Sequence, residues 1–156
     1  MPAQSFELTT EWRLDAPIQR VWAALQAVED WPKWWPMVRR VYLIKIGDAS
    51  GLGAVRRLEW ATALPYSLAF EVETVRVEPM TVIEGRARGE LEGVGLWTLT
   101  KDGGGTRVRY DWRVDVTQPW MRVMAPMLRP MFAWNHRVVM DSGFKGLKAL
   151  LAKTAG

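Results

Sequence analysis

The sequence contains no cysteine and only one histidine, His136. The absence of cysteine excludes disulfide bonds, thiolate metal sites, iron–sulfur clusters and a cysteine nucleophile. A single histidine excludes metal sites built from several imidazoles and leaves only carboxylate-rich sites of the magnesium or calcium kind. We therefore predict a protein without a metal site and without a cofactor.

Long apolar runs are also absent. No stretch approaches the roughly 18 apolar residues of a membrane-spanning helix, and residues 1–11 lack the basic flank and apolar run of a secretory signal. We therefore expect a cytoplasmic protein. The composition is that of a folded chain, since 49% of the 156 residues are hydrophobic and 24% are charged. This length suits one domain, which we predict to span residues 1–156.

Acidic residues are scarce towards the end of the chain. From residue 119 onward, six lysines and arginines stand against Asp141 alone, whereas the whole chain has a net charge of +4. A nucleic-acid-binding domain usually spreads its basic residues over a groove-facing surface. The local basic excess therefore favours an anionic partner at one end of the molecule, and we expect no nucleic acid as partner.

Alternation of apolar and polar residues predicts seven strands. In residues 107–116 the alternation has no error, with Val108, Tyr110 and Trp112 on one face and charged residues on the other. The predicted strands are residues 6–14, 38–46, 54–62, 67–78, 81–90, 93–100 and 107–116. In residues 67–78 the apolar positions change phase, which predicts a bulge near Glu73. Such strands form an antiparallel sheet with one face in water.

Helical spacing of apolar residues predicts helices at both ends of this series. The first covers residues 17–28, with Asp15 as N-cap and Pro17 in the first turn. Residues 31–36 contain three tryptophans and two prolines, which predict a short helical turn. At the C-terminal end we predict one helix over residues 119–128 and a second, opened by Pro130, that runs to about Lys153.

The order of these elements predicts an α+β fold. A curved, seven-stranded antiparallel sheet wraps around a long C-terminal helix, with short helices after the first strand. Because such a helix rarely fills the concave face of the sheet, we expect a cavity between them. The helix would turn one face inward, formed by Phe132, His136, Val139, Met140, Gly143, Leu147 and Leu150.

This order and four motifs resemble the START-like helix-grip superfamily (SRPBCC), in particular its polyketide cyclase/dehydratase and lipid-transport branch. The motifs are Ala16 to Trp22, Asp30 to Pro36, Gly51 to Arg56, and Asn135-His136 with Gly143 and Gly146-Leu147. The resemblance implies the helix-grip fold and a hydrophobic ligand held between helix and sheet. No residue matches the catalytic residues of characterised cyclases, so catalytic residues are unknown and enzymatic activity stays open.

Aromatic and methionine side chains form adaptable apolar linings, and the chain has ten tryptophans and eight methionines. The predicted ligand-binding residues are Trp60, Phe70, Trp97, Tyr110, Trp112, Met127, Met131, Asn135, His136 and Val139. His136 and Asn135 either hydrogen-bond a ligand carbonyl or hydroxyl, or make structural hydrogen bonds inside the core, which is the commoner role of buried polar groups.

Charged residues on three predicted strands also allow two interpretations. They form exposed ion pairs, the usual case for such runs, or some turn inward to orient a polar ligand group. The residues concerned are Glu71, Glu73, Glu84, Arg86, Arg88, Glu90, Arg57 and Glu59.

Residues 119–134 combine apolar side chains with arginines. Trp120, Met121, Met124, Met127, Met131 and Trp134 are interrupted by Arg122 and Arg129. This pattern fits a pocket gate, a transient contact with a membrane surface, or a homodimer interface.

Three functions fit the sequence as a whole. We favour a carrier or sequestering protein for a lipid-like or polycyclic ligand. The alternative is a cyclase/dehydratase-type enzyme that acts in the same cavity through His136, Tyr110 and an inward Glu or Arg. A third is a regulatory protein whose basic helix binds another protein. An acid or arginine beside His136 would favour chemistry, and an apolar lining would favour carriage.

Overall fold

The computed structural model describes residues 5–63, 67–89, 91–115 and 119–153, without the side chains of Ser5, Trp120, Met121 and Arg122. The predicted order of strands and helices is confirmed. The elements are β1 (Ser5–Leu14), α1 (Ile18–Gln26), η1 (Val28–Asp30), α2 (Trp31–Trp34), β2 (Val38–Lys45), β3 (Val55–Trp60), β4 (Leu68–Glu78), β5 (Val82–Gly89), β6 (Glu92–Asp102), β7 (Gly105–Asp115) and α3 (Pro119–Lys153). Glu90 and Val116, which we expected to end two strands, lie outside the described residues.

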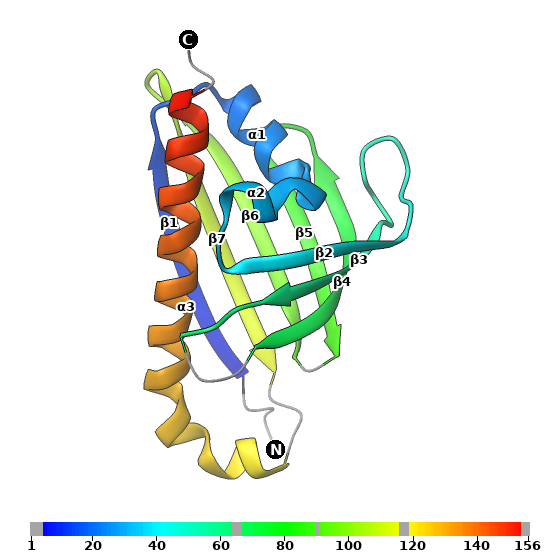
Figure 1. The fold of residues 1–156 in the computed structure, drawn as a ribbon, viewed down its shortest axis with the longest axis vertical. Coiled ribbons are helices and arrows are strands. Elements are labelled where there is room, and N and C mark those ends of the chain that lie inside the picture. Colours follow the sequence, from blue (N-terminus) through cyan, green and yellow to red (C-terminus); the bar gives the residue numbers. More distant parts are fainter. Residues whose placement is uncertain (1–4, 64–66, 90, 116–118, 154–156) are drawn as a thin grey trace.

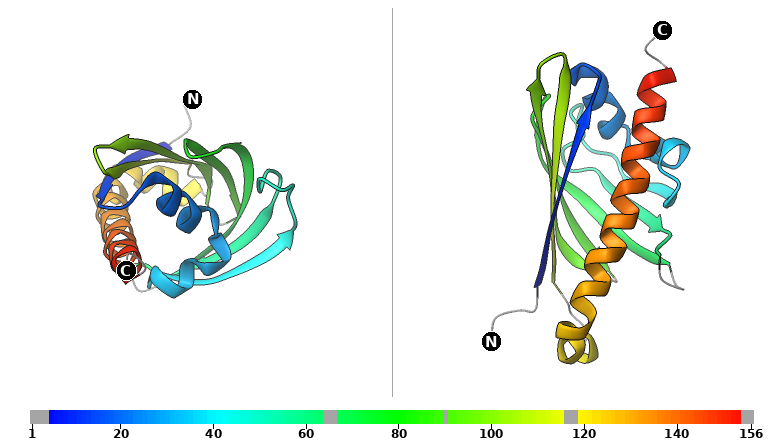
Figure 2. Two further views of the ribbon diagram at one scale, coloured as in Figure 1. Left: turned by 90° about the horizontal axis from the view of Figure 1, so that it is seen from above. Right: turned by 90° about the vertical axis from the view of Figure 1, so that its left-hand side faces the viewer.

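The seven strands form one antiparallel sheet in the order β1-β7-β6-β5-β4-β3-β2. The sheet curves strongly, and α3 lies along β1 at its side while α1 and α2 cover one end (Figure 1). Seen from above, the sheet and the helices are arranged in a ring (Figure 2). The predicted helix-grip architecture is therefore confirmed. The bulge predicted near Glu73 is confirmed as a register shift between Thr74 and Arg76 on β4.

A cluster of tryptophans forms the core at the covered end of the sheet. Trp31 and Trp34 of α2 and the adjoining Trp35 are buried, together with Trp12 of β1 and Trp97 of β6. Their rings lie 5.3–6.3 Å apart, centroid to centroid. Aromatic pairs at this separation add to the free energy gained by burying their area. This end of the molecule is therefore a packed core.

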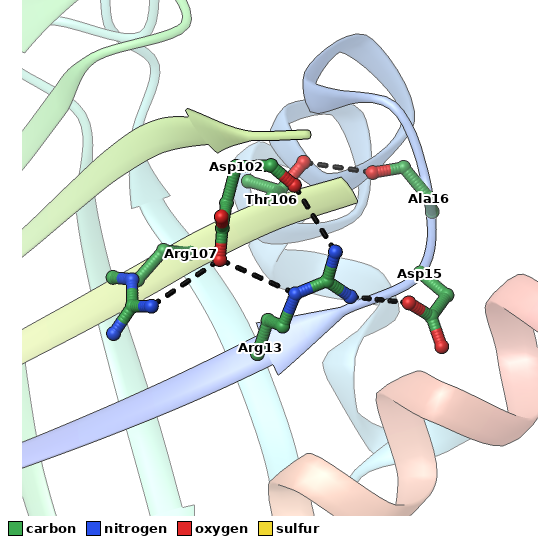
Figure 3. Close-up of polar contacts among 6 residues, drawn as sticks. All are labelled: Arg13, Asp15, Ala16, Asp102, Thr106 and Arg107. Carbon is green, nitrogen blue, oxygen red and sulfur yellow. Dashed lines mark hydrogen bonds and ion pairs between the residues drawn. The ribbon is translucent and has the colours of Figure 1, made fainter. Parts of the chain in front are cut away.

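Polar contacts join the end of β1, the β6–β7 hairpin and the start of α1 (Figure 3). The buried Thr106 hydroxyl donates to the carbonyl of Ala16 at 2.8 Å. Arg13 and Arg107 both contact the Asp102 carboxylate at 3.2 Å. Arg13 also pairs with Asp15. The prediction that Asp15 caps α1 is wrong, because Asp15 is drawn to this arginine and the N-cap residue is Pro17, without a side-chain cap.

The C-terminal region is one helix of 35 residues, so the predicted division at Pro130 is wrong. Pro126 and Pro130 both lie inside it. Each removes a backbone hydrogen bond, and prolines four residues apart disturb the same side of a helix, so the helix bends instead of ending. Figure 1 shows the yellow first turns of α3 directed across the axis of the orange part. No helix in the described ranges is long and apolar enough to cross a membrane.

Candidate ligand-binding cavity

A cavity of about 780 Å³ lies between the sheet and α3. Its floor comes from the inner faces of β3 to β7, and α3 contributes residues at helical spacing, among them Leu128, Phe132 and His136. Trp31 and Trp35 close it at the tryptophan core. Ligand sites of small molecules commonly have volumes of 300–1,000 Å³, so the cavity has the size of a binding site.

The structure brings together nine of the ten predicted site residues in the lining of this cavity. These are Trp60, Phe70, Trp97, Tyr110, Trp112, Met131, Asn135, His136 and Val139. Met127 is the exception, because it lies outside the lining and is 76% exposed. The helical face that borders the cavity runs through Leu128 and Phe132, and Met127 points away from it beside the bend.

Five aromatic rings of the lining form a series in which each ring is nearly parallel to the next. Along the series Trp60, Phe70, Trp112, Tyr110 and His136, neighbouring ring planes differ by 16°, 24°, 16° and 13°, at centroid separations of 6.0–6.3 Å. The first four come from β3, β4 and β7 and the last from α3. Because a flat molecule packs best against parallel ring faces, this lining favours a flat ligand.

The polar groups of the lining are few, and they are not equivalent. The side-chain oxygen of Asn135 accepts a hydrogen bond from the backbone N–H of Ala63 at 2.7 Å, which ties α3 to the chain beyond β3. Trp60 Nε1 and His136 Nε2 are buried without a hydrogen-bond partner in the described part of the chain. The structural role that we considered for Asn135 is thus seen, whereas His136 Nε2 has no such partner.

Charge is nearly absent from the cavity. Among the described residues that line it there is no Asp or Glu, and Arg56 is the one permanently charged side chain. Its Nε lies 2.7 Å from Oε1 of Glu29, so the charge is paired. Arg56 stands near the start of β3, whereas the contact of Asn135 with Ala63 lies beyond the end of that strand. Among the described lining residues, therefore, no charged group stands free beside His136 to indicate acid–base chemistry.

Arg56 was not among the predicted site residues. On β3, Arg56, Leu58 and Trp60 alternate with Val55, Arg57 and Glu59, and the first three line the cavity. Because every second residue of a strand faces the same side, the inward position of Trp60 would have predicted that Arg56 also faces the cavity. Its neighbours Arg57 and Glu59 face outward and approach each other at 3.8 Å.

The charged runs on β4 and β5 also face away from the cavity. Glu71 is opposite Arg88 and Glu73 opposite Arg86 in the strand register, and none of the four lines the cavity. The interpretation as exposed cross-strand pairs fits this placement, and Glu90 lies outside the described residues.

Burial keeps both titratable aromatic residues of the cavity uncharged. Desolvation lowers the pKa of His136 to about 4 and raises the pKa of Tyr110 above its ordinary value. At neutral pH the histidine is therefore a neutral imidazole and the tyrosine a neutral phenol. Neither group exchanges protons readily near pH 7.

Comparisons with known proteins agree with this architecture. The family model for polyketide cyclase / dehydrase and lipid transport matches residues 5–152. The chain belongs to this family. The match spans every described strand and nearly all of α3, so the cavity is built entirely from the part of the chain that defines the polyketide cyclase / dehydrase and lipid-transport family. No curated protein matches the chain.

Solved structures of similar shape come from distant relatives. A Thermus thermophilus protein is 19% identical, with a TM-score of 0.81 over 97% of this chain and 100% of that one. The ZhuI aromatase/cyclase from Streptomyces is 16% identical, with a TM-score of 0.80 over 98% and 97%. A START superfamily protein from Mycobacterium smegmatis is 13% identical, with a TM-score of 0.78 over 94% and 97%. At these identities the likeness establishes the fold of this family member and no more.

Proposed function

We propose that the protein binds a flat, hydrophobic small molecule in the cavity between the sheet and α3, as a carrier or sequestering protein. The observation that carries this proposal is the cavity lining, which has the size of a ligand site, is rich in parallel aromatic rings and lacks carboxylates among the described residues. Membership in a family that includes lipid-transport proteins supports it.

The affinity would come mainly from apolar contact. Burial contributes about 25 cal/mol per Å² of apolar surface, from which the cost of immobilising the ligand is subtracted. The walls are already packed around the tryptophan core, so little ordering of the protein accompanies binding. Affinity should therefore rise with the apolar area of flat ligands until the cavity is filled.

The second candidate is a cyclase/dehydratase-type enzyme. It is favoured by the position of Tyr110 and His136, whose rings face each other at 6.3 Å inside the cavity. Two observations weigh against it. The pKa of His136 is lowered to about 4, and the described lining supplies no carboxylate to hold a proton nearby. We therefore favour the carrier function over the enzyme.

Native mass spectrometry of the purified protein tests the proposal directly. We expect a complex with one small molecule, which denaturation releases and whose mass identifies its class. Loading with a flat aromatic compound should raise the melting temperature, because a ligand that binds only the folded state stabilises it. If neither a co-purified molecule nor any flat aromatic compound stabilises the fold, the carrier function is refuted.

A surface beside the cavity concerns how a ligand would enter the cavity. Val123, Met127, Met131 and Trp134, here called the exposed stripe, follow one side of α3 at spacings of three or four residues and are all exposed. Met131 also lines the cavity. Arg129 and Arg137 are exposed nearby, and no acidic residue occurs between Asp115 and Asp141. We assign this stripe to contact with an anionic lipid surface. Trp120, Met121 and Arg122, which we expected to contribute, have side chains outside the described ones.

A further inference from the structure

The phenol of Tyr110 lies flat across the floor of the cavity because residue 95 is a glycine. A Cβ atom at Gly95 would lie 2.5 Å from the Tyr110 hydroxyl oxygen and 3.1 Å from the adjoining ring carbons. Any other residue at this position would displace the ring from the sheet. Both residues line the cavity, and Gly95 on β6 is opposite Trp112 on β7. Gly95 therefore sets where the hydroxyl of Tyr110 is presented.

Neighbouring rings fix the plane of this phenol. Trp97 lies 4.2 Å away, centroid to centroid, and the rings of Trp112 and His136 are within 16° and 13° of parallel to it. Because the O–H bond of a phenol lies in the ring plane, the hydroxyl can donate only to an acceptor that reaches this plane beyond the rim of the ring, such as an oxygen at the edge of a ligand. The orientation is set before a ligand arrives.

The hydroxyl has nothing to donate to within the described residues. No hydrogen bond joins this hydroxyl to another described residue, and burial raises the pKa of Tyr110, so the group is protonated at neutral pH. By contrast, Trp35 Nε1 donates to the carbonyl of Val139 at 2.9 Å, and the oxygen of Asn135 is engaged by Ala63. The Tyr110 hydroxyl is not among the fully buried unpaired atoms of the described residues, so it borders the open space of the cavity, where a ligand can reach it. A protonated, unpaired donor in a cavity calls for an acceptor.

We infer that the hydroxyl of Tyr110, positioned by Gly95, donates a hydrogen bond to a carbonyl-type oxygen at the edge of the bound ligand. This inference rests on the proposed function, since it concerns the same cavity. It makes Tyr110 a specificity-determining residue. Between two flat molecules of equal shape, the cavity selects the one that carries an acceptor oxygen where the phenol points.

Two isosteric probes test this selection. 2-Acetylnaphthalene carries a ketone, and 2-isopropenylnaphthalene has the same shape with a methylene group in place of the oxygen. Dissociation constants for both are measured by quenching of tryptophan fluorescence. Tyr110→Phe should weaken binding of the ketone about three- to tenfold, the range for a neutral hydrogen bond, and change binding of the alkene less than about twofold. For each probe, the dissociation constant of the variant is divided by that of the unsubstituted protein. Comparing these two ratios removes the difference in solvation between the probes.

Variants elsewhere serve as controls. Tyr42→Phe makes the same change on β2, outside the cavity, and should alter neither probe. Gly95→Ala should reduce ketone binding selectively, as Tyr110→Phe does. In the double variant Gly95→Ala/Tyr110→Phe the loss should not exceed that of Tyr110→Phe, because no hydroxyl is left to displace. Thermal unfolding of each variant establishes that the fold is retained.

The outcomes separate this inference from the function on which it rests. Equal loss of both probes in Tyr110→Phe would mean that the ring only packs against the ligand, and an unchanged ketone affinity would mean that the hydroxyl is not used. Either result overturns the hydrogen bond and leaves the carrier function intact. If the unsubstituted protein binds neither probe, the proposed cavity function fails and this inference fails with it.

Discussion

The two halves of α3 differ in how they meet the rest of the molecule. From Val139 to Leu151 the helix packs against the tryptophan core, and Gly143 and Gly146 allow that contact. A Cβ at Gly143 would lie 2.5 Å from Cε2 of Trp35, and one at Gly146 would overlap the carbonyl oxygen of Trp34. From Val123 to Trp134 the same helix borders the cavity on one side and exposes apolar side chains on the other.

This difference shows how one helix serves stability and binding at once. The packed half anchors the helix, and the other half, which contacts the sheet through Ala125 and Phe132 on Phe6, borders a cavity of about 780 Å³. A cavity in the fold forgoes dispersion contacts and burial, which the packed half offsets. Substitutions in the packed half should therefore change the free energy of unfolding, and substitutions in the open half should change binding.

The largest effect is expected for Trp35→Ala. Trp35 is 1% exposed, stacks on Trp34 at 5.5 Å and hydrogen-bonds the backbone of α3 through its indole. Its truncation should cost about 4 kcal/mol, as for other buried aromatic residues. Urea unfolding measures this, with Trp134→Ala in the open half as the matched control, expected to cost less than about 1 kcal/mol. Similar costs at the two positions would contradict the contrast between the halves.

Gly146→Ala should have the next largest effect. Alanine favours helix by about 1 kcal/mol over glycine, which alone would stabilise α3. The added methyl group would overlap the backbone of Trp34, however, and the helix must shift away from α2. Because overpacking of this kind costs up to about 3 kcal/mol, we expect a net loss of about 2 kcal/mol.

The control for Gly146→Ala is Gly104→Ala in the β6–β7 hairpin, where a Cβ would meet nothing within 4 Å. We expect a change within about 0.5 kcal/mol there. A net gain of stability in Gly146→Ala would show that α3 and α2 are less closely packed than the structure indicates.

A smaller effect concerns His136, the one histidine of the chain, which lies on α3 between the two halves and lines the cavity. Its pKa is lowered to about 4 in the folded state from an ordinary value of 6.5. Between these values the unfolded chain binds a proton that the folded protein does not, so stability falls as the pH decreases from 6.5 towards 4. From pH 6.5 to pH 5 the loss should be about 1.5 kcal/mol.

His136→Gln provides the comparison for this pH dependence, since glutamine does not titrate. Urea unfolding of both proteins at each pH separates the contribution of His136 from that of the carboxylates, which both proteins share. The unsubstituted protein should lose about 1.5 kcal/mol more than the variant between pH 6.5 and pH 5. Parallel stability curves would show that the imidazole is hydrated in the cavity.

The sequence predicted best where burial alone decides the structure. Strand periodicity placed Trp60, Trp97, Tyr110 and Trp112 correctly, because an inward residue repeats every second position. It failed where two local interactions compete. Asp15 has the residue type of an N-cap, yet it pairs with Arg13. Arg13 also contacts Asp102 in the β6–β7 hairpin, which is distant in sequence.

The site contains features that no pattern in the sequence marks. Pro130 is a helix breaker by local rules, but α3 continues through it, and Ala125 and Phe132 on either side of Pro130 pack against Phe6 of β1. The unpaired atoms Trp60 Nε1 and His136 Nε2 result from the way strands and helix meet. The same applies to the placement of the Tyr110 hydroxyl over Gly95, since β6 and β7 must first be in register.

The exposed stripe should matter for lipid contact and hardly for stability. We expect the triple variant Val123→Ser/Met127→Ser/Trp134→Ser to unfold within about 1 kcal/mol of the unsubstituted protein, since its side chains are exposed. In flotation assays with vesicles of phosphatidylglycerol and phosphatidylcholine, its binding should fall at least about fivefold, since apolar area drives interfacial binding. Added salt should weaken binding of the unsubstituted protein, because Arg129 and Arg137 attract the anionic surface.

A second exposed apolar group gives the control. Ile44 and Ile46 are exposed at the end of edge strand β2, away from the charged part of α3. Ile44→Ser/Ile46→Ser removes apolar surface without touching the stripe and should leave vesicle binding within about twofold. A concentration-dependent dimer in solution that only the triple variant loses would assign the stripe to a second copy of the chain and overturn the lipid contact. Loss of vesicle binding in the triple variant alone, without such a dimer, would connect the open half of α3 to loading of the cavity beside it.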